Sequence, residues 1–255
     1  SQSQLPVATA YAEFLRALEK NTEGLVAIEG DSGSSSLALD KGQSLKHVLA
    51  IVGGEPVDAV ISELQLEARV DPSVVKRLKL KPVGKVTPFA MPEETDIVIV
   101  PEVAIGDLKI KNVPALVQDL SPMAVGETPG VILGRQVMAR VGSITFDFAK
   151  REVVVTKDAA APSGAAELPV IFLDLRAYAV PAVPVGVDGA EHKFWAWLGG
   201  VWTSGVGITK KAYLKSGHRP GDVADPENAE AGLKAVYVNS LDLGDIKYEG
   251  LGGLV

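Results

Sequence analysis

Asp31 opens the run Asp31-Ser32-Gly33-Ser34, in which one acidic side chain precedes small residues and then an apolar segment. A carboxylate in this setting can act as a general base that activates a water molecule. The same residue types also form ordinary polar turns. The sequence contains no second Asp-Ser-Gly, so a partner carboxylate would have to come from another chain. We therefore interpret the run as a hairpin turn between LVAIE and SLALD, and keep a catalytic Asp31 as the alternative.

The sequence offers little for metal, thiol or phosphate chemistry. It has no cysteine, and its three histidines, His47, His192 and His218, lack the spacing of metal ligands. The glycine-rich stretch GVWTSGVGITKK lacks the lysine that a phosphate loop needs directly after its last glycine, since Val206 follows Gly205. We expect no metal ion and no cofactor.

All three tryptophans fall within KFWAWLGGVW, at positions 195, 197 and 202. Trp195 and Trp197 are two residues apart, so on a strand their side chains would face the same side. Such a pair either packs in a core or forms the aromatic wall of a peptide or glycan groove. We interpret the tryptophans as residues that pack in the core and between the two units, and keep the aromatic wall as the alternative.

The composition is that of a folded, acidic protein. Of the 255 residues, 47% are hydrophobic and 22% are charged, with a formal net charge of −7 and a pI near 5.1. This charge argues against a nucleic-acid-binding protein, which needs a basic face. No apolar run approaches the roughly 18 residues of a membrane-spanning helix, and SQSQLPVATA lacks the features of a signal peptide. A cleaved secreted protein would look the same, and we favour a periplasmic or secreted location over a cytoplasmic one.

The elements that must position these residues are mostly strands. Residues 7–20 carry apolar side chains at helical spacing and predict one short amphipathic helix. Downstream, short β-branched or alternating runs follow one another between Gly, Pro, Asn and Asp, which predicts an all-β barrel or sandwich. Residues 157–169 are rich in Ala, Pro, Ser and Gly and predict a linker.

The linker separates two similar halves. VAIGDLKIKNVPALV at 103–117 matches LDLGDIKYEGLGGLV at 241–255, with Gly-Asp at the same place. VGGE at 52–55 is echoed by VDGAE at 187–191, and DPSVVKRL by TKKAYL. We interpret the chain as a tandem repeat of one β unit. The second copy ends where the first continues through 118–155, which indicates a truncated sequence or an incomplete second unit.

This interpretation predicts four segments. They are an N-terminal helix and β-hairpin (1–45), a first unit (46–157), a linker (158–169) and a second, incomplete unit (170–255).

The order of segments in the first unit resembles the retropepsin-like aspartic proteases. VGGEPVDAVI reads as strand, turn and strand, VDPSVVKRLKLKPVG as a short helix, and TDIVIVPEVAIGDLKIKNVPALV as paired strands. Ile132-Leu133-Gly134, followed by a helix and the strand Phe146-Asp147-Phe148, is similar to the family segment that threads beside the catalytic loop. The likeness covers 46–157 well and 180–255 weakly. It implies a mainly β fold with two retropepsin-like β-barrel units in tandem, after the short N-terminal helix.

In this family each unit supplies Asp-(Thr/Ser)-Gly, and the two carboxylates share one proton. Aligned on the flanking segments, the first triplet falls on Ser62-Glu63-Leu64 and the second near Leu198-Gly199-Gly200. Neither contains an aspartate. Glu63 is one residue from the catalytic place, and neighbouring strand residues point to opposite faces. The resemblance therefore implies that the catalytic carboxylates are missing.

The sequence as a whole predicts a catalytically inactive aspartic-protease-like protein that binds an extended peptide or a protein partner, or acts as a scaffold. Main-chain hydrogen bonds to an added strand would supply the affinity. The predicted ligand-binding residues are Ser62, Glu63, Leu64, Trp197, Leu198, Gly199 and Gly200. An active aspartic endopeptidase using Asp31, and a carbohydrate-binding or envelope structural module, are the alternatives. We expect neither a nucleic-acid partner nor a membrane span.

Overall fold

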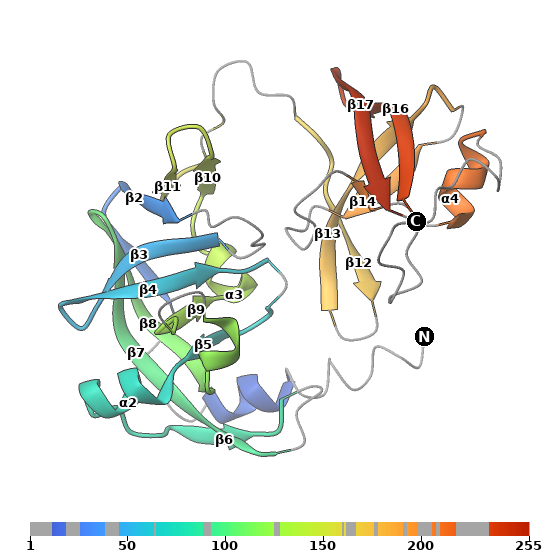
Figure 1. Ribbon diagram of the computed structural model, residues 1–255. Helices are drawn as coiled ribbons and strands as arrows, with labels where there is room; N and C mark the ends of the chain where they lie inside the picture. Colours follow the sequence, from blue (N-terminus) through green and yellow to red (C-terminus); the bar gives the residue numbers. More distant parts are fainter. Residues whose placement is uncertain are drawn as a thin grey trace. The chain divides into compact units, whose positions relative to one another are not determined.

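The computed structural model in Figure 1 divides into two compact units. The first covers most of the chain up to residue 161, and the second covers most of the chain from residue 162 on. The boundaries of the four segments that the sequence predicts remain predictions. The residues that the structure describes are 12–18, 26–38, 46–63, 65–88, 93–124, 128–159, 161, 167–175, 178–190, 193–197, 206–207, 210–217 and 235–254.

Six strands of the first unit close into a ring. Their order is β3 (Lys46–Val52), β4 (Glu55–Ile61), β9 (Val131–Leu133), β5 (Ala68–Val70), β8 (Leu108–Val117) and β7 (Thr95–Ile105), and β7 pairs back with β3. The pairs β4–β9 and β5–β8 are parallel, and the other four are antiparallel. The mainly β fold with a barrel that the sequence predicts is confirmed for this unit.

The barrel interior is filled by alternating side chains. In β3, Val48, Ala50 and Val52 are buried, whereas Leu49 between them is 49% exposed. In β9 all three residues are buried, so both faces of that strand are covered. A short continuous apolar run is typical of a strand in this position.

Five further strands extend the sheet around the ring. β2 (Ser32–Ala38) joins β3 to β11 (Glu152–Thr156), which pairs with β10 (Ser143–Asp147). β1 (Ala27–Glu29) pairs with β8, and β6 (Gly84–Val86) pairs with β7.

The Ser/Gly-rich run differs from the hairpin turn that the sequence predicts. Gly30 and Asp31 make the turn, whereas residues 32–36 belong to β2 and pair with β11. The two flanking strands bond to different neighbours, β1 to β8 and β2 to β11 and β3. Gly33 is buried, and a Cβ there would lie 1.8 Å from the carbonyl oxygen of Ile105. The run needs a residue without a side chain at position 33 because the end of β7 passes directly against β2.

Helix α2 (Pro72–Leu78) has a defined cap at each end. The side chain of Asp71 accepts a hydrogen bond from the Ser73 amide at 2.9 Å, which caps the first turn. Its other carboxylate oxygen accepts from the Leu120 amide at 3.2 Å, so the same buried side chain ties α2 to the segment after β8. The helix ends at Lys79, whose φ of 52° is left-handed.

The remaining helices of the first unit are short. Residues 12–18 are helical, inside the range 7–20 that the sequence predicts. A 3-10 turn, η1 (Ser121–Met123), follows β8, and α3 (Arg135–Met138) follows β9 after Gly134.

The described residues of the second unit form a six-stranded sheet and one short helix, α4 (Lys210–Lys215). The sheet order is β12 (Ile171–Leu175), β13 (Tyr178–Val187), β16 (Ala235–Leu243), β17 (Ile246–Leu254) and β15 (Val206–Gly207), and β14 (Phe194–Trp197) pairs with β13. Its buried core consists of Val183, Val185, Val187 and Val238. The described strands of this unit do not close into a ring, so a second barrel stays a prediction.

Within the residues that the structure describes, no helix is long and apolar enough to cross a membrane.

Candidate functional site

The loop after β4, residues 62–67, is bonded to the segment that carries β9 and α3. The amide of Ser62 donates to the carbonyl of Leu133 at 3.0 Å. Further along, the amide of Arg135 donates to the carbonyl of Gln65 at 2.9 Å. Gly134 makes this approach possible, because a Cβ on it would lie 2.4 Å from the carbonyl oxygen of Glu67. These contacts hold the predicted Ser62-Glu63 positions at the end of the parallel pair β4–β9.

The two described residues of the predicted triplet have different surroundings. Ser62 is buried, with 6% of its surface exposed. Glu63 accepts hydrogen bonds from Lys46 Nζ on both carboxylate oxygens, at 2.9 and 2.8 Å. Both side chains of this ion pair are mostly buried. Lys46 Nζ also lies 5.3 Å from the centre of the Phe146 ring, within the range of a cation–π contact.

Glu67, at the end of the same loop, is a carboxyl that the sequence analysis missed. Burial raises its pKa, because desolvation penalises the charged form, and this outweighs the opposing effects of a hydrogen bond from its own backbone amide and of the positive charges of Arg69 and Arg135. No spacing rule could have identified it, since its burial depends on the packing of the loop against Gly134.

A second polar pair lies further back on the same strands. His47 Nδ1 is 2.7 Å from Asp58 Oδ2, and His47 is 6% exposed. The Nε2 atom of His47 is buried and has no hydrogen-bond partner among the residues that the structure describes. Among the described parts of the chain, no group of three or more His, Asp or Glu side chains could hold a metal ion.

Asp31, the alternative catalytic residue, lies on an exposed turn. Its backbone carbonyl accepts a hydrogen bond from the Lys157 amide at 2.8 Å, which anchors the turn beside the end of β11. The turn is thus held by its main chain rather than by the carboxylate.

Some predicted residues of both units lie outside the described part of the chain. Leu64, Leu198, Gly199, Gly200 and Trp202 are outside the described residues, and Trp197 is described only as a backbone position of β14. Trp195 is 49% exposed, so it does not lie in the buried core of its unit, and packing of the tryptophans between the units stays a prediction.

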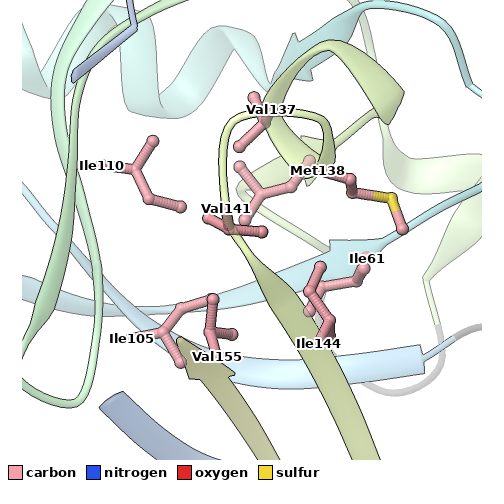
Figure 2. Close-up of a pocket in the computed structure, with 9 residues that line it drawn as sticks. Ile61, Ile105, Ile110, Val137, Met138, Val141, Ile144 and Val155 are labelled. Atoms are coloured by element: carbon pink, nitrogen blue, oxygen red, sulfur yellow. The ribbon is translucent and has the colours of Figure 1, made fainter. Parts of the chain in front are cut away.

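An apolar pocket lies inside the barrel next to the Ser62 loop (Figure 2). Side chains from the strands and from α3 point into it, and all of them are hydrophobic. Since no polar group is present to orient a ligand, we interpret it as a packing defect of the core. Its lining residues are Ile61, Ile105, Ile110, Leu133, Val137, Met138, Val141, Ile144 and Val155.

Comparison with known proteins gives a remote likeness of fold. No protein-family model matches the sequence, and no curated protein matches it. The structure is similar to the crystal structure of a retropepsin-like aspartic protease from Rickettsia conorii, at 12% sequence identity and a TM-score of 0.34. The match covers 52% of this chain and 94% of that chain. It is a similarity of fold over about half of the protein.

Proposed function

We propose that this chain is a catalytically inactive relative of the retropepsin-like aspartic proteases that serves as a peptide-binding or scaffold module. The proposal rests on the side chains of the loop after β4 and not on the remote similarity of fold. It includes the interpretation that the second unit is a related copy of the first.

The pairing of Glu63 with Lys46 carries the proposal. Aspartic-protease chemistry needs two carboxylates close enough to share one proton, so that one of them can activate water. At the end of β4 the corresponding place is taken by Ser62, which has no carboxylate. The next residue, Glu63, has both oxygens occupied by an ammonium group instead of facing a second acid. Ser62 and Glu63, the two described residues of the predicted triplet, therefore supply no general base of the required kind.

Peptide binding is the role that such a loop can keep without a carboxylate. An extended peptide gains affinity from main-chain hydrogen bonds and specificity from side-chain pockets. We assign ligand contacts to Ser62, Glu63 and Leu64 in the first unit, and to Trp197 and residues 198–200 in the second. A protein partner that presents an extended segment would use the same groups.

A peptidase assay tests the inactivity. The full chain is incubated with an unfolded protein substrate at acid and at neutral pH, with and without pepstatin. We expect no pepstatin-sensitive cleavage. Pepstatin-sensitive cleavage that disappears in Asp31→Asn or Glu63→Gln would overturn the proposal and identify the working carboxylate.

A binding assay tests the proposed binding of an extended peptide. The full chain is screened against a library of extended peptides, and a hit is measured again with Trp197→Ala and with Trp195→Ala as the neighbouring control. We expect loss of binding in the first variant with an unchanged melting temperature. Glycan binding without any peptide binding would favour the carbohydrate-binding alternative.

A further inference from the structure

The N-terminal helix, residues 12–18, presents one apolar stripe to the first unit. Phe14 is 1% exposed, and Ala17 and Leu18, three and four positions later, are partly buried. This spacing places the three side chains on one face of the helix, which is therefore amphipathic. The exposed residues of the other face are Glu13, Leu15 and Arg16.

The stripe fills an apolar socket on the outer face of β6, β7 and β8 (Figure 1). Ile97 and Leu116, which are paired across β7 and β8, belong to this socket. Their neighbours along the strands, Val98 and Ala115, belong to the barrel core instead. The socket is therefore a separate cluster on the opposite face of the same strands. The residues of this helix socket are Val83, Val86, Ile97 and Leu116.

Gly84 of β6 limits the size of the helix residue that faces it. A Cβ on Gly84 would lie 2.9 Å from the Cβ of Ala17, which is too close for two carbon atoms. Gly84 lies outside the left-handed region of the backbone, so the approach of the helix is the reason for a glycine here. The helix socket thus fits an aromatic residue, a small residue three positions later and an apolar residue four positions later.

The short length of the helix makes it dependent on the helix socket. Isolated helices shorter than about 12–15 residues are marginal in water, and this helix spans residues 12–18 in the described part of the chain. Because its apolar cluster is separate from the barrel core, opening the cluster leaves the core contacts in place. Local openings of such small units cost less free energy than global unfolding.

β6 depends on the helix for part of its packing. Its three residues pair with β7 alone among the described strands. Val86 is 4% exposed because it lies in the helix socket, and Gly84 lies against Ala17. Without the helix, Val86 would be exposed and β6 would be held by its pairing with β7.

We propose that the N-terminal helix is a displaceable strap. It leaves the helix socket by a local opening that spares the barrel, and this opening loosens β6. The open helix socket is then a binding site for an amphipathic helix with the pattern of Phe14, Ala17 and Leu18, and a free copy of the same segment can take it. This inference does not depend on peptidase activity or on the binding of an extended peptide.

The first experiment compares Phe14→Ala with Leu15→Ala in the full chain. Both substitutions shorten an apolar side chain of the helix, but Leu15 is 45% exposed and lies outside the stripe. Amide hydrogen exchange is measured at 84–86 and, as the reference, at 48–52 in β3. We expect Phe14→Ala to speed exchange at 84–86 by about tenfold or more, with the reference rates unchanged. Leu15→Ala should leave both sets of rates unchanged.

A second variant reaches the same state without altering Phe14. Gly84→Ala crowds Ala17 and should undock the helix, since the added methyl group would lie 2.9 Å from the Ala17 side chain. We expect the exchange at 85–86 to rise in this variant, again without a change at 48–52.

The binding site is tested with a labelled peptide that has the sequence of residues 7–20, VATAYAEFLRALEK. Fluorescence anisotropy measures its binding to the Phe14→Ala chain, and hydrogen exchange at 84–86 locates it. We expect saturable binding that restores slow exchange. The unsubstituted chain, whose own helix fills the helix socket, should bind the peptide about tenfold more weakly or worse. A peptide carrying the Phe14→Ala change is the control and should not bind.

Three results would overturn the inference. The first is equal exchange at 84–86 in Phe14→Ala and Leu15→Ala, which would mean that the helix does not hold β6. The second is an equal rise at 84–86 and 48–52, which would mean that the helix opens only when the whole unit unfolds. The third is the absence of peptide binding to the Phe14→Ala chain.

Discussion

Lys46 and Glu63 stand at the start of β3 and just past the end of β4, and the ammonium of one reaches both carboxylate oxygens of the other. The pair closes the open end of the β3–β4 hairpin, seventeen residues apart in sequence. Because both carboxylate oxygens of Glu63 are bonded to Lys46, Glu63 has a structural role.

Glu63→Gln should destabilise the first unit by about 1–2 kcal/mol. This value lies between the small contribution of an exposed ion pair and the cost of breaking a fully buried one. Urea unfolding followed by circular dichroism measures the change. Glu55→Gln, which breaks the exposed pair with Arg77, is the matched control and should cost less than about 0.5 kcal/mol. Equal effects of the two substitutions would contradict the structural role.

Leu133→Ala should destabilise the protein by about 2–5 kcal/mol, because the side chain is 2% exposed in the barrel core and its removal leaves a cavity. Leu49→Ala makes the same chemical change at a position that is 49% exposed. It should cost less than about 1 kcal/mol. Thermal melts of the two variants provide the comparison, and a tolerated Leu133→Ala would mean that β9 is not the buried strand described.

Gly33→Ala should cost about 1–3 kcal/mol, since the added methyl group would force the main chain of β2 away from Ile105. Asp31→Asn should leave stability within about 0.5 kcal/mol, because its carboxylate is exposed. Denaturant midpoints distinguish the two. A harmless alanine at position 33 would remove our explanation for the small residues in this run.

Glu67→Gln should change the pH dependence of stability. A carboxyl whose pKa is raised in the folded protein binds its proton more tightly there than in the unfolded chain. Its favourable contribution is therefore complete below the unfolded pKa and is lost as the pH rises through the folded pKa. Glutamine stays neutral, so the variant should gain stability relative to the native chain between acid and neutral pH. Melting temperatures across that range measure the gain, and Glu94→Gln, at an exposed glutamate, is the control. A difference that does not vary with pH would refute the assignment.

Much of the first unit could be predicted because its signals are local. The Gly-Gly and Gly-Asp turns specify hairpins, Asp71 followed by Pro72 specifies the start of α2, and the apolar run 131–133 specifies a buried strand. Each signal lies within a few residues of the element that it determines. The prediction of a tandem repeat uses the same kind of local signal, since Gly106 and Gly244 are left-handed residues in Gly-Asp turns.

The details of the candidate site depend on contacts between distant residues. Lys46 meets Glu63 because of the register of β3 against β4, and Glu67 is partly buried in a loop whose main chain packs on Gly134. The sequence favours a turn at residues 32–36, because serine and glycine have little intrinsic preference for strands. What holds it there is pairing with β11, more than a hundred positions away.

The ring of the first unit is joined between β3 and β7 through two residue pairs, Ile51 with Ala104 and Val52 with Val103. This ladder is as short as the one between β5 and β9, and opening it would turn the closed barrel into a curved sheet with two unpaired strand edges. We expect heat-induced aggregation of this protein to start from that partly opened form, while most of the native strand pairing is still intact.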